Sequence, residues 1–264
     1  MTFLHRRTVL RAAASGALAT VAGAPLVGCD DERPAASPSG RPTAKVSVRP
    51  APVGRVPALP PLPAGLPVQI EHGPRARKAV ALTFHGRGAA ETATGCLAEV
   101  ERAGARVTVL AVGDWLDAEP QLARRVLDGG HELGNHTMRH LDICAMDAKA
   151  AYAEIVQCAD RLRRLTGGVG RWFRPSKARL ATERVVRLAR RAGYPHVLSY
   201  DVDSLDFTDP GAAAVRSTVL NGVRPGSVVS LHFGHAGTVA ALPAILDGLH
   251  RRGLRAVTTS ELLT

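Results

Sequence analysis

Short apolar runs alternate with amphipathic stretches along the chain from residue 68 onward. The apolar runs have strand length, whereas the longer stretches place apolar residues three and four positions apart, which is the helical period. The predicted strands are Lys78–Phe84, Ala105–Val112, His131–Gly134, Arg171–Arg174, His196–Tyr200, Ser227–Phe233 and Leu254–Val257. The predicted helices include Glu91–Ala103, Gln121–Asp128, Ala148–Leu165, Thr182–Ala192 and Val239–Arg251.

This alternation predicts a single α/β domain over residues 68–264, most simply a distorted parallel (β/α) barrel of about seven strands. Reactive residues of such barrels lie at the C-terminal ends of the strands. We therefore expect the polar residues that end or follow these strands to meet on one face. They are His85, His136, Arg174, Asp203 and His232.

The N-terminal segment indicates export. Arg6 and Arg7 precede a mild apolar stretch that ends at Cys29, and this arrangement resembles a twin-arginine signal. The stretch is shorter than the roughly 20 residues that a membrane-spanning helix needs. Its last four residues, LVGC, resemble a bacterial lipoprotein box, in which the cysteine is acylated; an ordinary cleaved signal is the alternative. We expect residues 1–29 to be this signal and the protein to lie at the outer face of the cytoplasmic membrane through its lipid anchor, or to be secreted.

Residues 30–67 are rich in Pro, Ala and Ser, with proline most concentrated from Pro57 to Pro67. This composition cannot bury a core and favours extended chain. We expect a tether that holds the domain away from the membrane; a disordered binding tail is the alternative.

The net charge is +11 at pH 7, and removal of residues 1–29 with their three arginines leaves +8. A solvated arginine-rich surface accounts for this charge, and attraction to anionic wall polymers or membrane is the functional alternative. Nucleic acid is a poor partner, because aromatic residues make up only 4% of the chain and export removes the protein from it.

Three cysteines, Cys96, Cys144 and Cys158, accompany Cys29. At most one disulfide can form among these three. Cys96 and Cys158 occupy apolar positions of predicted helices, so we expect both in the core. No Cys-x-x-Cys spacing indicates a thiolate metal site.

His136 and His140 lie four residues apart in the string GHELGNHTMRH, residues 130–140. If this segment makes one helical turn, both imidazoles can reach the same metal ion. The spacing alone leaves a core or surface pair as the alternative.

This string resembles the second motif of the polysaccharide deacetylase family (the NodB-homology domain, a carbohydrate esterase family), where two histidines bind metal. Three later strings resemble the next motifs of the family in the right order: FRPS at 173–176, DSLDF at 203–207 and SLH at 230–232. The resemblance covers about residues 68 to 264. It implies metal-dependent removal of acetyl groups from N-acetylated glycans.

The first motif differs from the family pattern. The family reads TFDDG, where the first Asp is the general base and the second is a metal ligand. Here Thr83 and Phe84 are followed by His85 and Gly86, so both acidic residues are missing. The expected fold is unaffected, but the mechanism changes.

The resemblance assigns His136 and His140 as metal ligands, and a stable open site needs a third. Gly86 offers no side chain, so we predict His85 as the third ligand, with water in the open position. The alternative keeps His85 as the base and leaves the metal with two protein ligands. Arg174, which pairs with the base Asp in the family, would disfavour a protonated imidazole and so favours the ligand role. Imidazoles suit Zn²⁺, and also Co²⁺ or Ni²⁺.

His232 matches the general acid of the family, and Asp206 would bond its second ring nitrogen and fix the tautomer. A strand-end histidine bonded to backbone is the structural alternative. Without a replacement base, either the metal alone activates the water or His232 transfers both protons. The third motif lacks the usual aromatic residue after its proline; Phe207 is expected to line the cleft, and Trp172 to lie in the core.

The predicted function is a metal-dependent hydrolase that removes N-acetyl groups from peptidoglycan or chitooligosaccharide. One alternative is a catalytically inactive, carbohydrate-binding lipoprotein of the same fold. Another is an amidase or esterase with a non-sugar substrate. Retention of Arg174 and of the Asp206–His232 pair favours an active enzyme.

Overall fold

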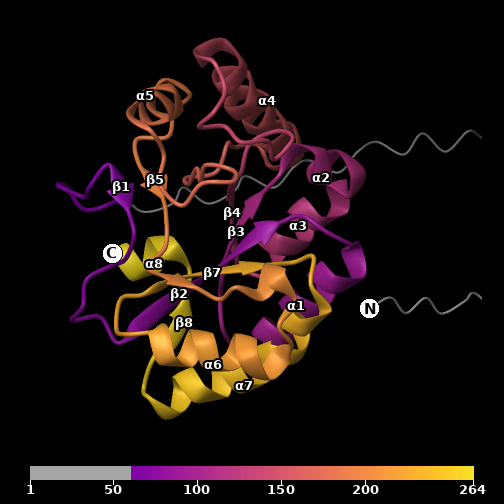
Figure 1. Ribbon diagram of the computed structural model, residues 1–264, viewed down its shortest axis with the longest axis vertical. Helices are drawn as coiled ribbons and strands as arrows, with labels where there is room; N and C mark the ends of the chain where they lie inside the picture. Colours follow the sequence, from indigo (N-terminus) through magenta and orange to yellow (C-terminus); the bar gives the residue numbers. More distant parts are fainter. Residues whose placement is uncertain (1–60) are drawn as a thin grey trace, which may run out of the picture. The chain divides into compact units, whose positions relative to one another are not determined.

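The computed structural model describes residues 61–264 (Figure 1). The predicted signal over 1–29, with Cys29, lies outside the described residues, as does the predicted tether up to residue 60. The last part of that tether contacts the domain: Leu62 and Leu66 pack against a core cluster, and the Pro67 carbonyl lies 2.8 Å from Nδ1 of His196. No helix within 61–264 has the length and apolar character to cross a membrane.

A curved, parallel β-sheet forms the centre of the domain, in the order β4-β3-β2-β7-β6. Ala81 of β2 pairs with Val228 of β7 and with Val257 of β8, so these two strands flank β2 on opposite edges. The strands are β1 (Gln69–Ile70), β2 (Ala79–Gly86), β3 (Thr108–Ala111), β4 (Glu132–Asn135), β5 (Val197–Leu198), β6 (Val202–Asp203), β7 (Val228–His232) and β8 (Arg255–Val257).

Single-residue bridges continue the array beyond β4. Phe173 forms parallel bridges with Asn135 of β4 and Val197 of β5, and β5 pairs in parallel with β1. The predicted strand Arg171–Arg174 is therefore wrong as a strand, because only Phe173 lies in bridging position. The predicted α/β class with a mostly parallel sheet is confirmed, and the bridges through Phe173 give the barrel its distortion.

Eight helices within residues 61–264 surround this sheet, and Figure 1 shows α1, α6 and α7 together on one side of β2. The five predicted helices are present. The structure adds α2, α6 and α8: α2 and α8 are too short to show a helical period, and α8 is set by a Thr258–Glu261 capping box. The helices are α1 (Ala90–Arg102), α2 (Gly113–Ala118), α3 (Pro120–Asp128), α4 (Ala148–Thr166), α5 (Glu183–Arg191), α6 (Ala212–Gly222), α7 (Ala236–Arg251) and α8 (Thr259–Leu263), with a 3-10 turn η1 (Asp206–Thr208).

Strand β2 has two buried faces, and their alternation positions the site. Val80, Leu82 and Phe84 face the helices and belong to the largest core cluster, where Phe84 stacks on Phe233 at 4.8 Å. The alternate residues Ala79 and Ala81 belong to a second cluster with the fully buried Trp172, as expected for that residue. Since side chains alternate along a strand, the second row continues through position 83 to position 85 at the C-terminal end of β2.

Candidate active site

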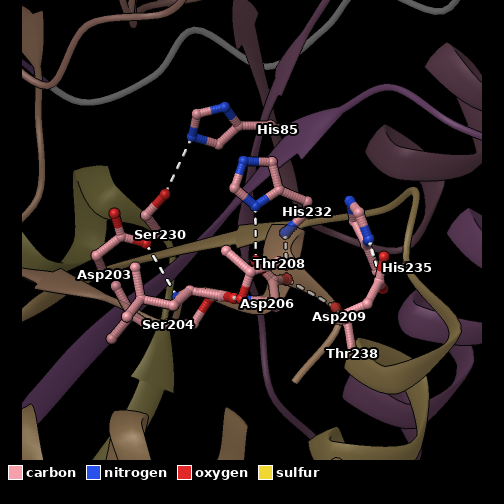
Figure 2. Close-up of polar contacts among 12 residues, drawn as sticks. His85, Asp203, Ser204, Asp206, Thr208, Asp209, Ser230, His232, His235 and Thr238 are labelled. Carbon is pink, nitrogen blue, oxygen red and sulfur yellow. Dashed lines mark hydrogen bonds and ion pairs between the residues drawn. The ribbon is translucent and has the colours of Figure 1, made fainter. Parts of the chain in front are cut away.

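His85 ends the inward row of β2 and lies beside β7. Its strand partner in β7 is His232, and the two imidazole centroids are 4.2 Å apart. Figure 2 shows both rings on the same side of the sheet, with Ser230 below His85. The parallel register therefore brings together two residues that are 147 positions apart in the sequence.

His136 and His140 converge, but through a loop after β4. The conditional expectation of a helical turn is wrong, because Thr137 and His140 have φ of 68° and 58°, which is left-handed backbone. Asn135 holds this loop: its Oδ1 accepts the Thr137 N–H at 2.9 Å, and its amide donates to the Ile155 carbonyl at 2.9 Å. The rings of His136 and His140 lie 4.8 Å apart.

His85, His136 and His140 form the candidate metal site. One nitrogen of each lies within 4.8 Å of the others. Burial is the main cause that lowers the pKa of His85 and of His136 well below 6.5. Burial also lowers the pKa of His140 to about 4, helped by the positive charges of Arg87 and Lys177. The three imidazoles are therefore neutral at pH 7, which is the form that binds metal.

His136 is already arranged as a ligand. Its Nδ1 lies 3.0 Å from the Arg174 carbonyl, which can only accept, so Nδ1 carries the proton and Nε2 keeps its lone pair. This buried Nε2 has no hydrogen-bond partner among residues 61–264. A histidine that binds a metal usually has a backbone carbonyl on one ring nitrogen and a free lone pair on the other.

The other two imidazoles are held by arginines. Nε2 of His85 lies 3.2 Å from a guanidinium nitrogen of Arg174 and 3.1 Å from Ser230 Oγ. Nδ1 of His140 lies 3.3 Å from a guanidinium nitrogen of Arg87. A guanidinium only donates, so each of these ring nitrogens accepts. Whichever nitrogen of either ring binds a metal, the arginine hydrogen bond must be given up.

Arg174 is fully buried without a carboxylate partner among the described residues. Besides His85, it donates to the Leu198 and Ser199 carbonyls at 3.0 and 2.9 Å and to Thr83 Oγ1 at 2.9 Å. Burial lowers its pKa to about 10, so the guanidinium is still protonated at pH 7. The partner of Arg174 at the end of β2 is therefore a neutral ring.

Gly86 lies on the outward row of β2, where a side chain would be tightly packed. A Cβ atom there would be 3.0 Å from Ala111 Cα and from Val109 Cγ1, and 3.2 Å from the ring of Trp115. Position 86 therefore offers the metal no side chain, and a larger residue would require its neighbours to shift by a few tenths of an ångström.

Asp206 and His232 form the predicted pair. Asp206 Oδ1 lies 2.7 Å from His232 Nδ1, and its Oδ2 accepts from the His232 backbone N–H at 2.8 Å and from Thr238 Oγ1 at 2.7 Å (Figure 2). Burial alone would raise the pKa of Asp206, but the His232 and Thr238 hydrogen bonds lower it below its ordinary value. The carboxylate thus holds the proton on Nδ1 and leaves the other ring nitrogen for proton exchange.

A cleft of about 630 Å³ opens above these groups. His85, His140 and His232 line it, and Phe207, 47% exposed, forms an aromatic wall with its ring 5.4 Å from that of His232. The expectation that Phe207 lines the cleft is confirmed. A sugar-sized ligand can therefore contact the candidate metal site and the Asp206–His232 pair together.

The cleft also contains residues that the sequence did not single out. Arg87, Lys177, Tyr200 and His235 all line it. The sequence signal that could have indicated them is their position beside or shortly after motif residues.

His235 belongs to a second His–Asp pair. Its Nδ1 lies 2.8 Å from Asp209 Oδ1, and its ring centroid is 6.0 Å from that of His232. The pair repeats the 26-residue separation of Asp206 and His232.

Glu154 of α4 anchors the histidine loop, a role that the sequence did not reveal. This buried carboxylate accepts the Arg139 backbone N–H at 2.8 Å and its side chain at 2.6 Å. The sequence assigned no role to Arg139, the residue before His140. Its contacts with Glu154 hold this part of the loop against α4. Cys96 and Cys158 are buried, as expected, and Cys144 is half-buried; all three are free thiols within residues 61–264.

The chain is similar in sequence to known deacetylases. A family model described as "Polysaccharide deacetylase" matches residues 72–197. A peptidoglycan-N-acetylglucosamine deacetylase from Bacillus cereus is 32% identical over 201 residues, which are 72% of this chain and 90% of the relative. A chitooligosaccharide deacetylase from Rhizobium leguminosarum bv. phaseoli is 30% identical over 162 residues, covering 56% of this chain and 70% of the relative.

Solved structures share the fold. A peptidoglycan N-acetylglucosamine deacetylase in complex with a benzamide superposes with a TM-score of 0.70 at 26% identity, covering 74% of this chain and 92% of that chain. A CE4 family pseudoenzyme from Bacillus anthracis gives a TM-score of 0.71 at 22% identity, covering 75% and 70%. The latter likeness shows the fold alone.

Proposed function

Because the chain belongs to the polysaccharide deacetylase family, we propose that it is a hydrolase that removes N-acetyl groups from a cell-wall or chitin-like glycan. The observation that carries this proposal is the placement of the Asp206–His232 pair beside three convergent imidazoles in one cleft. The relatives are named for peptidoglycan and chitooligosaccharide, so the proposed substrate is an N-acetylated glycan of either type.

We propose that a divalent metal, Zn²⁺ before Co²⁺ or Ni²⁺, is held by His136, His140 and His85. His136 supports this role, because its Nε2 lone pair is free of partners in the described part of the chain. His85 and His140 become ligands when their hydrogen bonds from Arg174 and Arg87 are given up. Imidazole is a donor that suits these ions. When bound, such an ion polarises the acetyl carbonyl and lowers the pKa of water.

His232 carries out the proposed proton transfers. It accepts one proton as water adds to the acetyl carbon, and it returns this proton to the nitrogen as the C–N bond breaks, so that acetate and a free amine result. Asp206 stabilises the protonated ring throughout. Asp203 is a poor base, because its oxygens already accept the Leu205 backbone N–H at 3.1 Å and contact the Tyr200 hydroxyl at 3.4 Å.

His85 is a poor base as well. In the neutral ring, the hydrogen bond from Arg174 to Nε2 leaves the proton on Nδ1. Its proposed role is that of a metal ligand, because it converges with His136 and His140, and this role requires the Arg174 hydrogen bond to be given up. The competing role, base with a two-histidine metal site, predicts unchanged metal content when His85 is removed.

A second function is favoured by the missing acidic residues. Gly86 provides no ligand side chain, and Arg174 is bonded to the neutral ring of His85 instead of a carboxylate. A protein with these changes would bind a glycan in the cleft without hydrolysing it.

We also propose, from the N-terminal sequence alone, that the protein is exported and anchored at the outer face of the cytoplasmic membrane through Cys29. Residues 30–67 would then hold the domain near the wall. Metabolic labelling with a radioactive fatty acid tests this: wild type takes up label, and Cys29→Ala does not.

The test of hydrolysis measures acetate release from acetylated chitooligosaccharide and from peptidoglycan, with Zn²⁺ and with a chelator. Release that the chelator stops and Zn²⁺ restores is the expected result. His232→Ala, which retains the metal site, is the control for contaminating activity. Binding of either glycan without acetate release, with metal supplied, would favour the binding protein instead.

A further inference from the structure

The cleft has an excess of positive charge. Asp203 is the only carboxylate among the described residues that line it, and its oxygens are already engaged. Arg87, Lys177 and Arg179 also line it, and the buried Arg174 lies directly beneath His85 without a carboxylate partner in the described part of the chain. A divalent metal would add to this excess.

Two of these cations have no ion-pair partner among the described residues. Arg179 is paired with Glu71 and also donates to the Tyr200 carbonyl at 3.1 Å. By contrast, Arg87 and Lys177 form no ion pair with any residue from 61 to 264. The hydrogen bond of Arg87 is to a neutral ring, that of His140. Both cations line the same cleft as His140.

Lys177 is held at the cleft in an unfavourable backbone conformation. Its φ is 57°, a left-handed value that is uncommon for a residue with a long side chain. The preceding Ser176 is fixed, since its hydroxyl accepts from Thr137 Oγ1 at 3.0 Å and donates to the Leu141 carbonyl. Such conformations persist where the surroundings enforce them, and they concentrate at functional sites.

Metal binding would release Arg87. Its guanidinium donates to Nδ1 of His140. If Nδ1 binds the metal, the lone pair is no longer available; if Nε2 binds it, Nδ1 must carry the proton. In both cases Arg87 loses its partner beside the metal site, and its donors become free for a ligand.

We propose that Arg87 and Lys177 form a carboxylate-binding subsite beside the metal site, which takes an acidic substituent of the glycan. The inference rests on the proposed glycan-binding function, but not on turnover. A guanidinium and an ammonium together give charge-assisted hydrogen bonds to a carboxylate. In an N-acetylated wall glycan, that carboxylate is either the carboxylate of the lactyl group of an N-acetylmuramoyl unit or a carboxylate of the peptide attached to this group. Neutral chitooligosaccharide has no group for this subsite.

The test compares disaccharides of N-acetylated sugars that differ in the lactyl ether and in what it carries. The probes are N-acetylglucosaminyl-N-acetylmuramic acid, its form extended by L-alanyl-D-isoglutamine, and neutral diacetylchitobiose. Binding is measured by calorimetry on the full chain with His232→Ala, so that hydrolysis does not interfere, with Zn²⁺ and with a chelator. We expect the muramic acid disaccharide to bind about tenfold or more tightly than diacetylchitobiose, as one charged hydrogen bond implies, and less tightly as salt rises.

Arg87→Gln and Lys177→Gln should each remove about tenfold of this preference, measured as the ratio of the acidic to the neutral affinity in the same variant. The Arg87→Gln effect should be larger with Zn²⁺ than with chelator. Arg216→Gln, on the exposed face of α6, removes the same charge away from the cleft and should change neither affinity. Loss of preference in the peptide-extended probe shows that only the free lactyl carboxylate is bound; its retention shows that the subsite also takes the peptide carboxylate.

Equal affinity for the acidic and neutral disaccharides would overturn the subsite, as would an equal loss in Arg216→Gln. The proposed hydrolysis is judged separately, by acetate release. A preference for muramic acid without acetate release keeps the subsite and contradicts the hydrolase. Acetate release without any preference does the opposite.

Discussion

The buried guanidinium of Arg174 donates a hydrogen bond to Nε2 of His85 across 3.2 Å. This contact fixes the proton of the neutral imidazole on Nδ1, and that nitrogen has no partner among residues 61–264. His85 must therefore change tautomer before it can bind a metal through Nδ1. The chemistry of the site depends on how this relationship responds to a metal.

His136→Ala is expected to abolish metal binding and turnover together, because His136 alone presents a free lone pair without rearrangement. His232→Ala should retain the metal and lower turnover by roughly 10²- to 10⁴-fold, the usual contribution of proton transfer. Metal analysis of the dialysed proteins, together with acetate release, checks both. Metal loss in His232→Ala would contradict the division of roles.

His85→Ala should lower metal content at limiting Zn²⁺, since it leaves two protein ligands. Its neighbour Arg174 remains buried in either protein, so a thermal melt with excess chelator measures the structural cost of the substitution separately. If wild type and His85→Ala retain the same amount of metal, His85 is not a ligand.

Gly86→Asp should not create a metal ligand. The new Cβ would lie 3.0 Å from the Ala111 backbone and face Trp115, and such overpacking costs about 1–3 kcal/mol of folding free energy. Denaturant unfolding checks the cost and calorimetry checks Zn²⁺ affinity. Gly168→Asp is the matched control, since no atom lies within 4 Å of its Cβ position. A tighter Zn²⁺ affinity in Gly86→Asp would contradict the placement of this residue.

The metal-free protein should lose stability as the pH falls below 6.5. Burial holds the pKa of His85 and His136 well below this value, and that of His140 near 4. Between the unfolded and folded pKa values the unfolded chain binds more protons, so each such histidine lowers the unfolding free energy by about 1.4 kcal/mol per pH unit. Above pH 6.5 all three are neutral in both states and contribute no slope.

Chemical unfolding between pH 7 and 5 measures this slope. His136→Ala should reduce it, and His250→Gln, at the exposed end of α7, should leave it unchanged. An identical slope in His136→Ala would show that this ring is not buried in the neutral form.

Glu154→Gln should weaken Zn²⁺ binding by roughly 10- to 100-fold, the usual effect of a residue that positions a metal ligand. Glu154 accepts the Arg139 backbone N–H at 2.8 Å and so fixes the loop that carries His140. Asp160→Asn, on the same helix but exposed, is the control. A change in thermal stability without a change in Zn²⁺ affinity would reduce Glu154 to a structural role.

Much of the site could be predicted because it depends on local pattern. The apolar runs that predicted β2 and β7 also predicted their ends, and parallel strands bring such ends to one edge. The sequence therefore predicts His85 and His232 on one face, and the register of β2 and β7 pairs them. The Asp206–His232 contact followed from a motif resemblance and is present at 2.7 Å.

Other features could not be predicted because they depend on distant partners. The loop of His136 and His140 has two left-handed residues, and it is held by Asn135 and by Glu154 of α4. A spacing of four cannot distinguish this loop from a helical turn. The short helices α2 and α8 could not be predicted either, since a helical period needs more residues than they contain.

The sequence by itself determined the α/β class, the inward-facing ends of the strands and the loss of both acidic residues of the first motif. These features depend on periodicity and residue type, and both are present in the sequence itself. Only the tertiary structure decided that Gly86 faces Trp115, that Arg174 fixes the tautomer of His85, and that Arg87 and Lys177 face the same cleft. Each of these depends on which atoms lie within a few ångströms of one another, and packing sets those distances between segments far apart in the chain.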